Sequence, residues 1–180
     1  MQMNMLNDAA TLSEYGHREQ KRRYTNEPYF THCEEVVSLA KMFIDDTNLL
    51  CALYCHDLLE DTNISKELIR DVLGQEVLSL VEELTDISKP EDGNRSVRKE
   101  IDRQHLAIIS DKAQTGKCFD IISNTISITK HDKKFALLYL KEIDSVLDIL
   151  VRADKEILDI AKGVVDMCWM DLEYDKLKLS

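Results

Sequence analysis

The feature that most constrains this chain is a charged motif at the end of an apolar segment. Residues from Leu49 to Leu59 are nearly all apolar. The end of this stretch overlaps with the motif His56-Asp57-Leu58-Leu59-Glu60-Asp61-Thr62. A helix of this composition would be buried over most of its surface. One imidazole and three carboxylates at its end are costly unless a cation compensates their charge. Acids are also unfavourable at a helix C-terminus, where the macrodipole prefers cations. The motif therefore predicts a bound metal.

Composition predicts an all-α protein. Hydrophobic residues make up 44% of the 180 residues, aromatic residues make up only 6%, and there are only 5 Gly and 2 Pro. So few helix breakers among many Leu, Ile, Lys and Glu residues favour helices, and the length suits one sizeable core. Apolar residues recur at helical spacing through most of the chain. We expect a single domain over residues 1–180, with a core of about 8–172, built as a bundle of about eight helices.

Charge and cysteine usage limit the partners and the compartment. The formal net charge of -11 argues against nucleic acid as a partner, because phosphate contacts need clustered cations. A small phosphorylated substrate is still compatible with a local basic patch or a metal. No apolar run reaches the ~18 residues of a membrane span, and the N-terminus does not have the pattern of a signal peptide. The five cysteines include no Cys-x-x-Cys pair, so we expect reduced thiols and a cytoplasmic protein with no membrane partner. The oligomeric state is left open.

Helical spacing groups the polar residues of the opening motif. On one continuous helix His56 and Glu60 lie four residues apart and share a face, while Asp57 and Asp61 share the adjacent face, about 100° round. Two ligands and two further carboxylates can therefore project into one cavity. The alternative is a helix end whose acids lie in solvent.

Further candidate ligands lie elsewhere in the chain. Asp120 lies within an apolar stretch of a predicted helix, where a lone buried carboxylate would be costly. Lys117 and Asn124 lie one turn either side of it, and an intrahelical Lys117–Asp120 ion pair, worth little free energy, is the alternative. His32 begins a helix of its own, a position where an isolated histidine is more often a capping or core residue. In the second His-Asp pair, His131-Asp132, we interpret the aspartate as a helix N-cap.

Taken in chain order, four stretches resemble the HD-domain metal phosphohydrolases. The resemblance is closer to one branch, the hydrolase domain of RelA/SpoT-type proteins and their stand-alone small alarmone hydrolases, including the animal form. The four stretches are 17–32 (His17 to His32), 56–62, 80–85 (Leu80-Val81-Glu82-Glu83-Leu84-Thr85) and 117–124. Each stretch alone is a weak signal, whereas the ordered set is specific.

The resemblance implies a metal site and a pair of catalytic residues. The implied ligands of one Mn²⁺ are His32, His56, Asp57 and Asp120. The implied residues that position and activate the attacking water are Glu60 and Asp61. Two imidazoles and two carboxylates suit Mn²⁺ or Fe²⁺ better than Mg²⁺ or Ca²⁺, which prefer oxygen ligands, so Fe²⁺ or another divalent transition metal is the alternative.

The resemblance also implies a nucleotide substrate. The residues expected to line its pocket are Arg22, Arg23, Lys117, Asn124 and Tyr139. The family reaction removes the 3′-pyrophosphate of guanosine tetraphosphate (ppGpp), while some small members act on the 2′-phosphate of NADPH. This chain differs from the branch's pattern at Glu19, Arg23, Asn26, Cys33 and Ile121. None of these is an implied ligand, so the differences leave the metal site intact and the nucleotide open.

Three alternatives accompany the ppGpp hydrolase hypothesis. The first is the same chemistry on NADPH or another phosphorylated nucleotide. The second is a catalytically silent HD protein that binds a nucleotide as a sensor. Loss of Glu60 or Asp61 would favour it, and both are present. The third is a helical adaptor with an acidic surface, which leaves the buried acids unexplained.

Overall fold

The computed structural model describes residues 2–178, with side chains described from Asn4 to Asp175. These residues form ten α-helices and one short 3-10 helix, compared with the eight or so that the sequence predicts. No β-strand occurs within this part of the chain, where the only extended pairing recorded is an isolated bridge between Lys21 and Pro28. The all-α fold class is thus confirmed.

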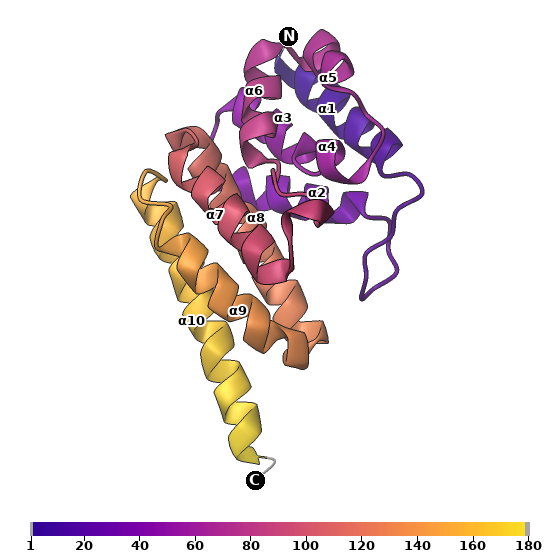
Figure 1. Ribbon diagram of the computed structural model, residues 1–180. Coiled ribbons are helices and arrows are strands. Elements are labelled where there is room, and N and C mark those ends of the chain that lie inside the picture. The colour runs from indigo at the N-terminus through magenta and orange to yellow at the C-terminus, as the bar shows by residue number, and fades with distance from the viewer. Residues whose placement is uncertain (1, 179–180) are drawn as a thin grey trace. The chain divides into compact units, whose positions relative to one another are not determined.

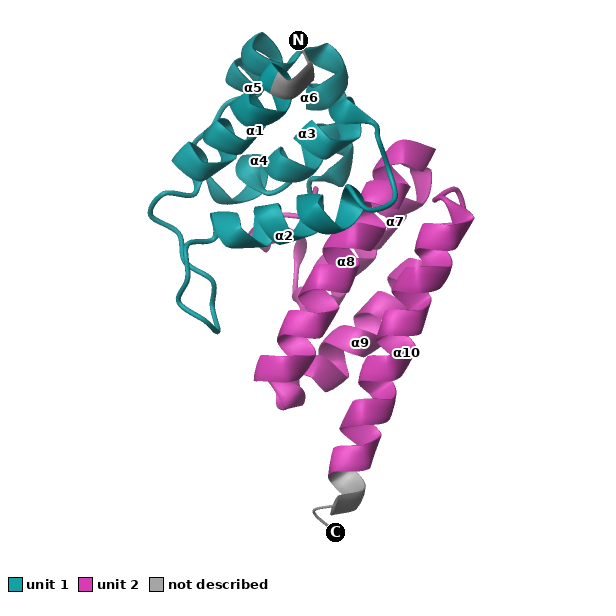
Figure 2. Cartoon of the chain, turned by 180° about the vertical axis from the view of Figure 1, so that it is seen from behind, with its two compact units in different colours: residues 1–86 teal, residues 87–180 magenta. Residues whose placement is uncertain are grey.

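The chain divides into two compact units, residues 1–86 and 87–180 (Figure 2). The expectation of a single domain over the whole chain stays a prediction, because a division into compact units does not test it.

The first unit is built around one buried helix. Its helices are α1 (Gln2–Gly16), α2 (Phe30–Ala40), α3 (Thr47–Cys55), α4 (Leu58–Asp61), α5 (Lys66–Leu73) and α6 (Gln75–Leu84). The apolar helix α3 packs against α1, α2 and α6, so it lies at the centre of this unit (Figure 1). Six of its nine residues are buried. The predicted burial of this segment is therefore confirmed.

The second unit is a group of longer helices. They are η1 (Pro90–Asp92), α7 (Arg95–Ile108), α8 (Asp111–His131), α9 (Lys133–Leu147) and α10 (Lys155–Lys178). Helix α8 packs against both α9 and α10, and α7 packs against α9 (Figure 1). Eleven of the 21 residues of α8 are buried, which makes it the core helix of this unit.

Side-chain caps define several helix starts. Asp46 accepts hydrogen bonds from the backbone N–H groups of the first turn of α3, and Ser65 and Ser110 cap α5 and α8 in the same way. Asp132 caps α9 by accepting from the Phe135 N–H, which confirms its interpretation as an N-cap. Gly74 ends α5 with a positive φ of 90°, a conformation that glycine adopts without strain.

The expectation of one continuous helix through the opening motif is wrong at His56 and Asp57. Helix α3 ends at Cys55, and the single turn α4 starts at Leu58. Asp57 has φ -96° and ψ -2°, in the sparsely populated bridge region between helical and extended backbone. Adjacent residues of a regular helix point about 100° apart. Because the helix is interrupted here, the side chains of His56 and Asp57 can converge on one point.

All five cysteines are free and buried, in agreement with the expected reduced thiols. Burial, with a smaller contribution from nearby acids, raises the pKa of the Cys51 thiol to about 11. Among the described helices, none combines the length and the low polarity needed to cross a bilayer.

Gly16, the last residue of α1, lies close to side chains of α4 and of the segment that follows it. A Cβ atom at this position would lie 2.4 Å from Cδ2 of Leu58 and 3.2 Å from Cγ1 of Ile64. Leu58 is fully buried, so it has little room to move aside. The absence of a side chain at Gly16 therefore allows α1 to approach α4.

Gly16→Ala is expected to lower the free energy of unfolding by about 1–3 kcal/mol, the usual cost of overpacking a core. Urea unfolding followed by circular dichroism measures it. The matched control is Gly163→Ala in α10, where a Cβ would contact nothing within 4 Å. We expect this control to gain roughly 0.5–1 kcal/mol from helix propensity. Equal effects at both positions would contradict this packing argument.

Candidate metal centre

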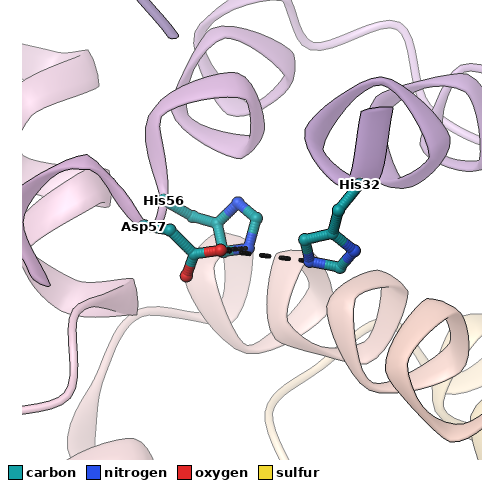
Figure 3. A group of neighbouring side chains, drawn as sticks. All are labelled: His32, His56 and Asp57. Atoms are coloured by element: carbon teal, nitrogen blue, oxygen red, sulfur yellow. Dashed lines mark ion pairs between the residues drawn. The ribbon is translucent and has the colours of Figure 1, made fainter. Parts of the chain in front are cut away.

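Three side chains of the first unit converge on one point. The ligand atoms of His32, His56 and Asp57 all lie within 4.8 Å of one another. Oδ2 of Asp57 is 3.1 Å from Nε2 of His56 and 4.0 Å from Nε2 of His32 (Figure 3). The two imidazole rings meet edge to face, with centroids 5.4 Å apart. The structure thus brings together three of the four ligands that the sequence predicts.

Separate elements position these three residues. His32 lies in the first turn of α2, His56 directly follows α3, and Asp57 directly precedes α4. Both histidines are buried and Asp57 is half-buried. The apolar packing of α3 therefore fixes where the His-Asp pair meets the histidine of α2.

A backbone carbonyl determines which nitrogen of His56 faces the site. Nδ1 of His56 is 2.8 Å from the carbonyl oxygen of Leu53. A carbonyl only accepts hydrogen bonds, so Nδ1 carries a proton and the neutral ring points the lone pair of Nε2 at Asp57. Two acceptor atoms 3.1 Å apart repel each other unless a proton or a metal ion lies between them. The donor set therefore fits a divalent metal, and a backbone-bonded second nitrogen is usual for a metal-binding histidine.

Tyr29 supplies a contact that reasoning from sequence missed. Its hydroxyl donates a 2.6 Å hydrogen bond to Oδ2 of Asp57, the oxygen that faces both histidines. The ring of Tyr29 also lies edge-on to that of His32, with centroids 5.6 Å apart. Tyr29 belongs to the Pro-Tyr-x-x-His part of the first matching stretch, which was the available signal.

The two proposed catalytic carboxylates lie in α4, directly after the His-Asp pair. Oε1 of Glu60 accepts a 2.6 Å hydrogen bond from the backbone N–H of Asp86. Oδ2 of Asp61 accepts a 2.8 Å hydrogen bond from Nε2 of Gln20. Both side chains are exposed, and Asp61 and Gln20 line a hollow of about 420 Å³ within the first unit. Both carboxylates are thus held in place and open to water.

Asp120 lies in the second unit, in the middle of α8. Its Oδ2 is 2.9 Å from Nζ of Lys117 and its Oδ1 accepts a 2.6 Å hydrogen bond from Nδ2 of Asn124. The intrahelical ion pair that the sequence offered as an alternative is therefore present. The shared face of these three residues is as predicted, and the role of Asp120 as a metal ligand stays a prediction.

Tyr139 of α9 lies close to the same face of α8. The pKa of its hydroxyl is raised, chiefly by burial and then by the negative charge of Asp120. The hydroxyl therefore keeps its proton at neutral pH and remains a hydrogen-bond donor.

The predicted nucleotide-binding arginines belong to the loop between α1 and α2. Nη1 of Arg22 forms a 2.7 Å ion pair with Oε1 of Glu35 in α2. The guanidinium group of Arg23 lies 5.5 Å from the centre of the Tyr24 ring. Asn26 has a φ of 61°, a left-handed conformation that asparagine adopts more readily than most residues. This explains how the loop accommodates Asn26 where the related branch has glycine.

Residues 9–110 match the sequence family described as the HD domain. The match covers more than half of the chain and includes the three converging candidate ligands. The chain therefore belongs to the HD-domain family.

Two named relatives show which proteins this chain is similar to. A protein of Brucella melitensis named GTP pyrophosphokinase rsh is 32% identical over 139 residues, which are 74% of this chain and 18% of that protein. A Xenopus tropicalis protein named guanosine-3′,5′-bis(diphosphate) 3′-pyrophosphohydrolase MESH1 is 33% identical over 123 residues, which cover 65% of each chain. The chain thus spans less than a fifth of the Brucella relative.

One solved structure confirms the fold. It is that of a metazoan orthologue of SpoT described as hydrolysing ppGpp, and it matches with a TM-score of 0.81. The match covers 91% of this chain and 94% of the other at 22% sequence identity. At this identity the likeness concerns the fold alone.

Asp57→Ala is expected to abolish metal binding, because it removes the carboxylate that faces both histidines. In the wild type, Mn²⁺ at about 100 times its dissociation constant should raise the free energy of unfolding by about 2.7 kcal/mol. The variant should show no such gain. Elemental analysis after Mn²⁺ loading and urea unfolding with and without Mn²⁺ measure the two effects.

The matched control for this prediction is Asp45→Ala, which removes an exposed carboxylate of the same unit. It should leave the metal content and the stabilisation by Mn²⁺ unchanged. A wild-type protein that holds no metal after Mn²⁺ is supplied would contradict the assignment of the site.

Proposed function

We propose that this protein is a metal-dependent phosphohydrolase that removes the 3′-pyrophosphate of ppGpp. The observation that carries the proposal is the convergence of His32, His56 and Asp57 within 4.8 Å, directly before the carboxylates of Glu60 and Asp61. Two of the candidate ligands and both candidate bases thus come from one short segment, residues 56–61, and the third candidate ligand comes from α2. A helical adaptor would have no use for this arrangement.

The choice of substrate is supported by the names of the relatives. The Xenopus relative is named for the 3′-pyrophosphohydrolysis of guanosine-3′,5′-bis(diphosphate), and the metazoan SpoT orthologue of similar fold is described as hydrolysing ppGpp. We carry this substrate over to the present chain as a proposal.

We propose Asp120 as the fourth ligand, from its place in the ordered motifs, beside His32, His56 and Asp57. The metal proposed is Mn²⁺, with Fe²⁺ as the alternative, because mixed imidazole and carboxylate ligands suit these ions. When bound, such a metal would polarise a phosphoryl oxygen and make a water molecule more acidic.

The residues of the chain would handle the proton of the attacking water. The carboxylate of Glu60 or Asp61 accepts this proton as the water oxygen bonds to the phosphorus attached to the ribose 3′ oxygen. The bond between that phosphorus and the 3′ oxygen then breaks, pyrophosphate leaves, and a proton restores the ribose hydroxyl. Such general-base help contributes about 10²–10⁴ in rate.

We propose that five residues bind the nucleotide: Arg22, Arg23, Lys117, Asn124 and Tyr139. Guanidinium groups pair with phosphate or stack on a base, so the two arginines suit either end of the substrate. Arg22 is paired with Glu35, and a phosphate group would have to compete with that carboxylate. The protonated hydroxyl of Tyr139 would serve as a donor to the nucleotide.

The proposed partner is therefore a small phosphorylated nucleotide, with no nucleic acid and no membrane. The net charge of -11 supports the exclusion of nucleic acid. The five free, buried thiols support a reducing, cytoplasmic location.

Glu60→Gln is expected to retain the metal and to lower kcat by about 10²–10⁴, because the amide cannot accept the proton of the water. Steady-state kinetics and elemental analysis on the same sample measure both quantities. Glu14→Gln, which alters an exposed glutamate of α1, is the matched control and should keep full activity. Loss of the metal from the Glu60 variant would instead make Glu60 a ligand.

A substrate panel tests the proposed activity itself. The Mn²⁺-loaded wild type should release pyrophosphate from ppGpp faster than phosphate from NADPH or from a nucleoside monophosphate. Faster release of phosphate from NADPH would make NADPH the proposed substrate, and the proposed metal-dependent hydrolysis would stand. Activity on none of the three, with metal bound, would favour a silent nucleotide-binding protein.

A further inference from the structure

We propose that His17 is a positioning residue that holds Asp61 through Gln20 and Asp57 through Tyr29. The proposal rests on the proposed function, since it assigns a task to Asp61 and Asp57 in the hydrolase site. His17 is neither a predicted ligand nor a predicted catalytic residue.

His17 is a buried polar side chain next to the site. It directly follows the close contact of Gly16, and only 1% of its surface is exposed. Its Nδ1 lies 2.6 Å from Oε1 of Gln20. Its Nε2 is buried with no hydrogen-bond partner among the side chains that the structure describes. The neutral ring with its proton on Nδ1 satisfies this environment best, because it buries no unpaired N–H group.

The first arm of the arrangement runs from His17 through Gln20 to Asp61. The amide oxygen of Gln20 accepts from Nδ1 of His17, so its NH₂ group faces the other way and donates to Oδ2 of Asp61 at 2.8 Å. Without the imidazole donor the amide could rotate and present its oxygen to the carboxylate. His17 therefore determines which end of Gln20 meets Asp61.

The second arm runs from His17 through Tyr29 to Asp57. The rings of His17 and Tyr29 are in contact, with centroids 4.8 Å apart. The hydroxyl of Tyr29 donates to Oδ2 of Asp57 at 2.6 Å. The imidazole thus supports the flank of the ring that orients the central carboxylate of the metal centre.

The two arms hold the carboxylates of Asp57 and Asp61. The proposed hydrolysis depends on where these two groups lie relative to each other. Asp57 faces the histidines, while Asp61 lies one turn further along, at the hollow open to water. Both are held from the same loop, by Gln20 and Tyr29. Losing an outer partner of this kind typically costs 10–100-fold in metal affinity or activity.

Substitutions at His17 separate a positioning role from a packing role. His17→Asn keeps a side-chain N–H near the place of Nδ1, whereas His17→Leu has a similar size and no donor. We expect His17→Leu to lower kcat about 10-fold or more, with KM changed less than about twofold. We expect His17→Asn to restore most of kcat.

If leucine at the buried position of His17 prevents folding, Gln20→Met provides a second test. Gln20 is half-buried beside the hollow, and methionine matches its length without hydrogen bonds. Its loss of kcat should equal that of His17→Leu, and the double variant should lose no more than either single variant. Tyr29→Phe should instead weaken Mn²⁺ binding by about 10-fold.

A readout independent of activity is the side-chain amide of Gln20 in ¹⁵N NMR spectra of the full chain. We expect hydrogen-bonded amide protons in the wild type and in His17→Asn, and freely exchanging ones in His17→Leu. Unchanged amide signals in His17→Leu, or unchanged kcat in folded His17→Leu and Gln20→Met, would overturn the proposal. A wild type inactive on every nucleotide but with the expected amide signals would overturn the proposed function and leave the hydrogen-bond network standing.

Discussion

The structure of the site depends on the contacts of one carboxylate oxygen, Oδ2 of Asp57. It faces Nε2 of two buried histidines, His32 and His56, and accepts a hydrogen bond from Tyr29. The Leu53 carbonyl fixes His56 so that a lone pair points at this oxygen in the neutral ring. Two acceptors at this distance repel each other unless a proton or a metal ion lies between them. The apolar packing of α3 and the interruption after Cys55 serve to assemble it.

The loop between α1 and α2 contacts this centre and also carries two of the residues proposed to bind the nucleotide. Gln20 and Tyr29 hold the two carboxylates, while Arg22 and Arg23 provide cations between them in sequence. The loop doubles back on itself, with the N–H of Tyr29 donating to the carbonyl of Gln20 at 3.0 Å. Changes in this loop can therefore affect substrate choice and catalysis together.

The sequence predicted what depends on local patterns. The helix cap at Asp132 and the face shared by Lys117, Asp120 and Asn124 depend on spacings of three or four residues. The interruption at His56 was not predictable, because the apolar residues Leu58 and Leu59 follow the His-Asp pair and continue the helical pattern. The hydrogen bonds from Gln20 to Asp61 and from Tyr29 to Asp57 were not predictable either, because they depend on how a long loop folds back. The role of Asp120 as a ligand rests on its place among the ordered motifs alone.

The central claim is that His32 and His56 bind one metal ion through nitrogen. Electron–nuclear double resonance on the Mn²⁺-loaded full chain, grown with ¹⁵N-histidine, measures this directly. We expect hyperfine coupling from two histidine nitrogens, with one coupling lost in His32→Ala and the other in His56→Ala. A Mn²⁺ spectrum without any histidine nitrogen coupling would contradict it.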